Sequence, residues 1–396
     1  MGSLVLRNAR LGLGPDSRLA DLAISRGRVA GVFAAGEAPG GEPEADLVGR
    51  LLVPGLVNAH DHLDLSLFPP LGRPPYVSAY AWAEDIAGAM DDPRARQALA
   101  VPLVDRLWLG GLRNLLSGVT AVAHHGAYHR SLGRPDFPVR VLAKYDFALS
   151  PGLTPQLRKA YRTSDRRIPW LVHAAEGVDA RCRGEVRLLA EANVLRQNTV
   201  IIHGIGIAPE DVSLIAAARS AVVWCPESNR RLYGATAPFS SLRAAGIPVG
   251  LGSDSPASGV RDALSNLAAA RREGEWGDAE LLALATHASG AVARLPVGGF
   301  EPGAPADFAA VGDMEGLWAG DRRSLALVMT AGKPLWGERD LMTVLSPQAQ
   351  PCKLEGSERA LLPAFAKRVQ ALGKVHRAVR EAGFLADLEF GDRGGW

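Results

Sequence analysis

The sequence has little of what several classes of protein require. Only 3 of its 396 residues are cysteine, and their spacing forms neither a disulfide framework nor a paired zinc motif. No apolar run reaches the length that crosses a membrane, and the N-terminal stretch carries arginines where a cleavable signal would be apolar. These absences predict a soluble protein in a reducing, cytoplasmic location, with no membrane partner.

An excess of charge of one sign is also lacking. The formal net charge is +2, and 44 Lys and Arg residues are interleaved with 42 Asp and Glu residues. A protein that binds nucleic acid would normally carry a basic patch or stripe. We therefore expect no nucleic-acid partner.

The chain does contain a regular alternation of apolar strands and amphipathic helices. Hydrophobic residues make up 47% of the sequence, which is ample for a large core. Near-continuous apolar strands separated by helices are typical of a parallel sheet covered on both faces. Seven such strands are predicted, over residues 51–58, 119–124, 139–147, 169–173, 199–203, 221–225 and 248–252. We therefore expect an α/β fold with a TIM-like (β/α)8-type barrel, one unit short or distorted because seven strands are found.

The two ends of the chain have a different texture. Short apolar–polar alternations divided by Gly, Pro and Asp occur near both ends, and they are typical of small antiparallel strands. We predict a composite β-sandwich domain from residues 1–52 and 303–350, a barrel over residues 53–302, and a helical segment over residues 351–396.

Histidines and carboxylates follow several of the predicted barrel strands. The carboxyl ends of parallel strands converge on one mouth of a barrel, so these side chains should gather there. A single histidine at a strand end is usually structural, and a His-x-His pair alone is moderate evidence. Imidazoles and carboxylates from four strand ends together suit a divalent ion that keeps a position open for water. The set is His60, His62, His173, Glu176, His203 and Asp254.

Six motifs in a fixed order carry a family resemblance. They are "PGLVNAHDH", "GVTAV", "HAAEG", "IIHG", "WCPESNRRL" and "LGSDS", spread from Pro54 to Ser255. With them the chain resembles the amidohydrolase superfamily, and within it the branch of cytosine deaminase, guanine deaminase and the triazine hydrolases. The resemblance covers most of the chain and is much less specific to substrate than to superfamily.

The resemblance implies roles for the polar residues at the mouth. Glu176 would be the proton shuttle, and His203 would hydrogen-bond the metal-bound water or the substrate. Asp254 would both bind the metal and hold the hydroxide that attacks an sp² carbon. Binuclear members bridge two metals with a carboxylated lysine, but the only nearby strand lysine, Lys144, falls on the third strand, so one divalent ion is expected. Zinc is the expected ion and iron the alternative, and the implied ligands are His60, His62, His173 and Asp254.

Four further residues are candidates for substrate binding. His124 and His125 are adjacent, so only one of them can face the mouth, and a packing role is an equal alternative. The resemblance places Asn229 near the site. Trp82 could stack on a planar substrate, although a tryptophan beside an apolar segment is more often part of the core.

These observations together predict a metal-dependent amidohydrolase that acts on a C–N bond of a small molecule. The predicted reaction is deamination of an aminated heterocycle or cyclic amidine by metal-bound hydroxide. The alternative enzymatic function is hydrolysis of an amide, or loss of a leaving group other than ammonia. The alternative non-enzymatic function is a catalytically inactive barrel that serves as a scaffold. A homodimer is a possible assembly.

Overall fold

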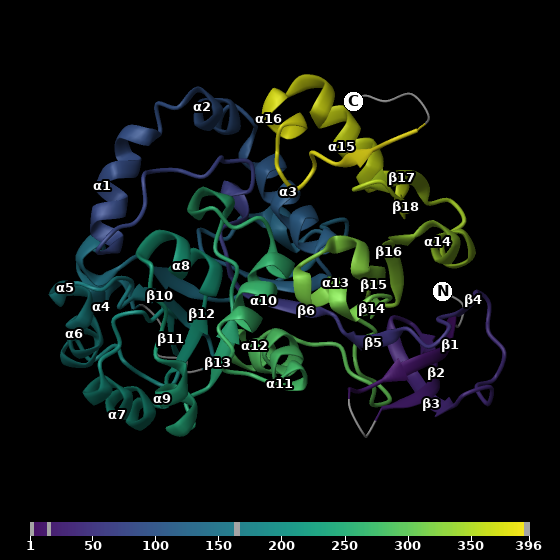
Figure 1. The fold of residues 1–396 in the computed structure, drawn as a ribbon, viewed down its shortest axis with the longest axis horizontal. Coiled ribbons are helices and arrows are strands. Elements are labelled where there is room, and N and C mark those ends of the chain that lie inside the picture. Colours follow the sequence, from purple (N-terminus) through teal and green to yellow (C-terminus); the bar gives the residue numbers. More distant parts are fainter. Residues whose placement is uncertain (1–3, 14–16, 162–166, 392–396) are drawn as a thin grey trace.

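A barrel of parallel strands occupies one half of the molecule (Figure 1). The computed structural model describes residues 4–13, 17–161 and 167–391. The barrel wall consists of two sheets, which meet where Asp61 forms a bridge with Asp254, just beyond the last barrel strand. One sheet contains β6 (Leu56–Asp61), β7 (Val119–His124) and β8 (Arg140–Val141), and the other contains β9 (Asp146–Ala148), β10 (Trp170–Ala174), β11 (Thr199–His203), β12 (Ala221–Trp224) and β13 (Val249–Leu251).

The stretch predicted as one strand over residues 139–147 forms two short strands. β8 pairs with β7, whereas β9 pairs with β10. Only residues 142–145 separate β8 from β9, which is too few for the crossover that neighbouring parallel strands require. β8 and β9 are therefore two parts of one pass of the chain, and the described residues make seven passes around the barrel. The predicted TIM-like barrel is confirmed, with its shortened unit located here.

Helices cover the outside of the barrel (Figure 1). In α3 (Leu103–Leu116), Leu107, Leu112 and Leu115 are buried and form the apolar stripe that packs on the barrel. The other helices of this part are α1 (Ala79–Ala89), α2 (Pro93–Leu99), α4 (Leu157–Ala160), α5 (Ala180–Arg183), α6 (Glu185–Glu191), α7 (Pro209–Ala218), α8 (Pro226–Tyr233), α9 (Phe239–Ala244), α10 (Ala263–Arg272), α11 (Asp278–Ala283) and α12 (Ser289–Ala293).

The other half of the molecule is an 11-stranded sheet built from both ends of the chain (Figure 1). Its order is β19-β17-β18-β16-β15-β14-β5-β1-β2-β3, with β4 paired to β1. Along the chain, α13 (Met314–Ala319) comes between β14 and β15, and α14 (Arg339–Leu345) comes between β16 and β17. The strands are β1 (Leu4–Leu11), β2 (Arg18–Ser25), β3 (Arg28–Ala34), β4 (Glu44–Asp46), β5 (Leu51–Pro54), β14 (Phe308–Val311), β15 (Leu325–Thr330), β16 (Lys333–Glu338), β17 (Gln350–Leu354), β18 (Ser357–Leu361) and β19 (Leu388–Glu389).

The first predicted barrel strand, residues 51–58, is divided between the two halves. β5 belongs to the large sheet and β6 to the barrel, and Gly55 lies between them. A Cβ at Gly55 would lie 2.2 Å from side-chain atoms of Thr120, so only glycine allows this close approach. The apolar run conceals this junction, because a strand that changes sheets remains apolar throughout.

The C-terminal segment contributes strands as well as helices. The predicted helices over residues 351–396 include α15 (Pro363–Val375) and α16 (Arg377–Arg380), but β17, β18 and β19 extend the large sheet. The division of the chain at residues 52, 302 and 350 stays a prediction. Within the described part of the chain, no helix is both long and apolar enough to cross a bilayer.

Candidate metal centre and active site

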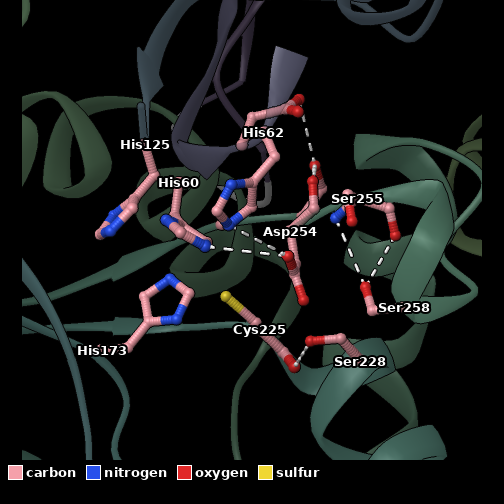
Figure 2. A network of polar contacts seen from close by, with 12 residues as sticks. His60, His62, His125, His173, Cys225, Ser228, Asp254, Ser255 and Ser258 are labelled. Atoms are coloured by element: carbon pink, nitrogen blue, oxygen red, sulfur yellow. Dashed lines mark hydrogen bonds and ion pairs between the residues drawn. The ribbon is translucent and has the colours of Figure 1, made fainter. Parts of the chain in front are cut away.

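Three histidines from two barrel strands lie together at the mouth of the barrel. His60 lies in β6, His62 directly follows β6, and His173 lies in β10. One ring nitrogen from each lies within 4.8 Å of the others. Their rings surround a common space (Figure 2), with the centroid of His60 4.9 Å from that of His62 and 5.0 Å from that of His173. Sequence-distant histidines are thus brought together as the strand-end argument predicts.

Asp254 closes this space from the far end of the barrel sheet. Its Oδ1 lies 3.9 Å from His60 Nε2 and 3.7 Å from His62 Nε2. Its backbone N–H donates to the His60 carbonyl at 3.1 Å, and its φ is +60°. A non-glycine residue in the left-handed region is held there by its surroundings, and such residues cluster at functional sites.

Glu176 lies deeper, between two imidazoles. Its Oε2 is 3.3 Å from His173 Nδ1 and its Oε1 is 3.5 Å from His203 Nε2. The Tyr233 hydroxyl donates to Oε1 at 2.7 Å, and Glu176 is only 3% exposed. Burial and the Glu176 charge raise the pKa of Tyr233 well above its usual range, so the phenol keeps its proton. The carboxylate is therefore held in one orientation.

His203 is oriented by Asn229, a residue that the family resemblance implies near the site. The His203 Nδ1 lies 2.8 Å from the Asn229 side-chain oxygen, and the Asn229 amide donates back to the His203 carbonyl at 3.4 Å. Because the oxygen can only accept, Nδ1 carries the proton and Nε2 faces Glu176. His203 also has a positive φ, +74°.

Several buried nitrogens of these rings have no hydrogen-bond partner. They are both ring nitrogens of His60, and Nε2 of His173 and of His203. Buried polar atoms are nearly always paired, so unpartnered ones indicate a missing ligand. Burial and the surrounding imidazoles hold the pKa of His60 and of His173 well below their usual range, so both rings stay neutral, the form that binds a metal. The residues present fit a divalent cation.

The structure separates the two adjacent histidines. His125 faces inward with Ala121 and Ala123, and its ring centroid is 4.3 Å from that of His173. Its Nε2 lies 3.0 Å from the Ala148 carbonyl, and its Nδ1 has no partner. His124 points away, because its Nδ1 accepts from Leu63 N–H at 3.3 Å, and burial lowers its pKa to about 4. Of the two, only His125 is among the site histidines.

Trp82 is not among the residues that surround the candidate metal centre, and it lies on the outer side of Tyr233. It is partly buried against a small cluster that contains Tyr233, Leu232 and Ile205. Its indole N–H is buried without a partner. Trp82 therefore borders Tyr233, which contacts Glu176.

Tyr233 was not predicted as a site residue. It lies four residues after Asn229 on α8, so helical spacing could have indicated that both face the site. Cys225 also lies beside the histidines (Figure 2), where burial raises the pKa of its thiol well above the usual range. Asp61, between the two mouth histidines, pairs with Arg113, and no local signal links residues 52 positions apart.

The segment after His62 lies across the mouth. Backbone hydrogen bonds tie it to residues that follow three different barrel strands. Leu71 N–H donates to Ala257 O at 2.8 Å, Tyr76 N–H to Leu232 O at 2.7 Å, and Ala79 N–H to Glu176 O at 2.9 Å. Because these acceptors follow β13, β12 and β10, the segment spans the mouth from one side of the barrel sheet to the other.

Comparisons with known proteins agree on one family. A model described as the amidohydrolase family matches residues 166–335. The chain is 27% identical over 294 residues to a 5-methylthioadenosine/S-adenosylhomocysteine deaminase of Halobacterium salinarum, covering 62% of this chain and 67% of the relative. It is 28% identical over 278 residues to an aminodeoxyfutalosine deaminase of Deinococcus radiodurans, covering 53% of this chain and 65% of the relative. The matched stretch thus spans about two thirds of these relatives' length.

Solved structures match over a longer part of the chain. A zinc-bound adenosine deaminase from Xanthomonas campestris superposes with a TM-score of 0.68 at 18% identity, covering 85% of this chain and 94% of that one. A zinc complex of atrazine chlorohydrolase from Arthrobacter aurescens gives a TM-score of 0.66 at 18% identity, covering 84% and 95%. At this level of identity the similarity shows the fold, which agrees with the barrel and the composite sheet described above.

Proposed function

Because the chain belongs to the amidohydrolase superfamily, in the branch of deaminases and triazine hydrolases, we propose that it is a metal-dependent hydrolase that deaminates an aminated heterocycle or cyclic amidine. The observation that carries the proposal is the position of Glu176. Its carboxylate lies between His173 and His203, fixed by Tyr233, beside buried ring nitrogens that have no partner. A shuttle carboxylate and a place for an ion are thus adjacent.

His60, His62, His173 and Asp254 would hold one divalent ion, with zinc proposed and iron as the alternative. When bound, such an ion lowers the pKa of a coordinated water towards about 7. The proposal of a single ion is supported by Lys144, the only candidate bridging lysine, which is exposed on the short stretch between β8 and β9.

Glu176 moves the proton in this proposal. Its Oε1 is fixed by Tyr233, so the carboxylate stays within reach of a water at the mouth. It takes a proton from that water as the oxygen attacks the ring carbon, and it delivers the proton to the leaving nitrogen. General acid–base transfer by a positioned carboxyl contributes roughly 10²–10⁴ in rate.

His203 would contact the water or the substrate at the reacting carbon. Its Nδ1–H is held by Asn229, so Nε2 is the acceptor atom that faces Glu176 and the mouth. From there Nε2 would accept a hydrogen bond from the attacking water or from the substrate and so fix its position. Asp254 would hold the attacking water.

The substrate contacts remain part of the proposal. His125 is the best placed, because its unpartnered Nδ1 borders His173 and can accept from a ring N–H or amino group. Trp82 would stack only on a part of the substrate that reaches beyond Tyr233. Relatives are named as deaminases of 5-methylthioadenosine or S-adenosylhomocysteine, of aminodeoxyfutalosine and of 8-oxoguanine, which supports an aminated ring as the substrate class. A cytoplasmic location and a homodimer stay predictions.

Ammonia release tests the proposal directly. The metal-loaded protein is incubated with a panel of aminopurines, aminopyrimidines, their nucleosides and cyclic amidines, and with amides as the comparison set. Ammonia release from at least one aminated ring is the expected result. Hydrolysis of amides without ammonia release from any ring would replace the deaminase with the amide hydrolase. No hydrolysis of any compound, together with a failure of the protein to retain one equivalent of added divalent metal, would favour the scaffold.

A further inference from the structure

Cys225 lies on the floor of the metal centre. It directly follows β12, and with Val223 it belongs to the cluster of side chains that fills the barrel interior. The side chain is fully buried. Figure 2 shows its sulfur pointing into the space between His60, His173 and Asp254.

Two of the unpartnered imidazoles lie next to this sulfur. A ring nitrogen of His60, a ring nitrogen of His203 and Cys225 Sγ all lie within 4.8 Å of one another. His60 has no hydrogen-bond partner on either nitrogen, His203 has none on Nε2, and both side chains are fully buried. A sulfur and a nitrogen on one zinc-like ion are at most about 4.4 Å apart, the sum of a Zn–S bond of about 2.3 Å and a Zn–N bond of about 2.1 Å, so small side-chain rotations would suffice.

We propose that His60, His203 and Cys225 form a second cation position, which takes a thiophilic divalent ion such as Cd²⁺. It shares His60 with the ligand set proposed above, so the two positions are alternatives. Thiolate and imidazole are the donors that soft ions prefer, whereas harder ions favour the position that includes Asp254. On binding, the thiol proton is exchanged for the ion and released to solvent.

The position has a direct consequence for the enzyme. An ion bound there takes His60 from the set that would hold the catalytic ion, and it occupies His203 Nε2, the atom that faces Glu176. Thiophilic ions are therefore inhibitors that act from inside the centre. This inference concerns metal binding alone and does not depend on the substrate.

A cadmium titration with a matched cysteine control tests the inference. Chelator-treated protein is titrated with Cd²⁺ while the ultraviolet thiolate-to-cadmium charge-transfer absorbance is recorded. The variants are Cys225→Ser and, as the control, Cys352→Ser, since Cys352 is also buried but lies in β17 of the large sheet. The wild type and Cys352→Ser should develop the band at one equivalent, and Cys225→Ser should not. Its Kd for Cd²⁺ should rise by more than about 10-fold, since even groups outside the first coordination shell affect affinity by 10–100-fold.

Two results would overturn the inference. One is the absence of the band in wild-type protein that binds Cd²⁺, and the other is an undiminished band in Cys225→Ser. If Cys225→Ser does not fold, ¹¹³Cd NMR of the wild type decides instead. A resonance shifted downfield by sulfur supports the position, and one in the range of nitrogen and oxygen ligands rejects it.

Discussion

Replacing Arg113 by Met is the most informative perturbation of the scaffold that holds the centre. The Arg113 guanidinium Nη2 donates to both carboxylate oxygens of Asp61, at 2.6 and 2.7 Å. The two side chains are 1% and 0% exposed. The same nitrogen also reaches the Asp254 carbonyl at 3.4 Å, so one side chain on α3 joins the strand of His60 to the loop of Asp254.

The expected loss of folding free energy follows from the burial of the Arg113–Asp61 pair. Methionine retains the length and apolar character of the arginine stem but leaves the Asp61 carboxylate without its counter-charge. Removing one partner of a fully buried ion pair costs about 3–5 kcal/mol, because the remaining charge cannot be solvated. Burial already raises the pKa of Asp61, and without Arg113 it rises further. The side-chain amides of Asn58 and Asn114 still donate to Asp61, which places the expected loss near the lower end.

Urea unfolding of chelator-treated protein measures the loss, and the metal Kd measures its effect on the centre. Arg96→Met is the control, since Arg96 and its partner Asp91 are 63% and 83% exposed. Arg113→Met should lose about 3 kcal/mol and bind Zn²⁺ about 10-fold more weakly, as outer-shell partners do. The double variant with Asp61→Asn should recover part of the stability. A loss below about 1 kcal/mol, as for a surface pair, would refute the reasoning.

Three further predictions concern the residues around the shuttle. Glu176→Gln should keep its metal, measured by elemental analysis, and lose at least about 10²-fold in kcat, whereas full activity would remove the shuttle role. Tyr233→Phe should also keep its metal but lower kcat by about 10-fold with KM little changed, because only the orientation of Glu176 is lost; an unchanged kcat would show that the hydrogen bond is dispensable. Burial raises the pKa of Glu185 from 4.5 to about 7, so folding stability should fall as pH rises between these values, because the unfolded carboxyl has already released its proton. In Glu185→Gln the decrease in the free energy of unfolding between these pH values should be smaller by up to about 3 kcal/mol, measured by urea unfolding. If the wild type and the variant lose the same free energy over this pH range, the raised pKa of Glu185 is contradicted.

The superfamily and the fold class could be predicted from the sequence, because both depend on local motifs and on the periodic spacing of apolar residues. Apolar runs separated by helices predicted the barrel, and the ordered motifs predicted the superfamily. The split of residues 51–58 at Gly55 could not be predicted in this way, since the strand stays apolar on both sides of the junction. In the sequence the shortened unit appeared only as a missing strand. The structure locates it at β8 and β9, because β8 pairs with β7 and β9 pairs with β10.

The site was predictable where its residues follow strands, and less so where they act across the fold. The strand-end argument named His60, His173 and Asp254 from topology alone. It could not choose between His124 and His125, because the sequence does not show which alternate residues of this strand face the barrel interior. In the structure Ala121 and Ala123 face the interior, and His125 continues that alternation. Contacts between distant segments, such as that of Arg113 with Asp61, have no sequence signature.

In the proposed reaction, one divalent ion and Glu176 act together. The most direct test is the rate of ammonia release as zinc is returned stepwise to chelator-treated protein, with the bound ion quantified in the same samples. We expect no ammonia release without metal, a linear rise as zinc is returned, and a plateau at one equivalent. Release from metal-free protein, or a rise that continues to two equivalents, would contradict the proposal.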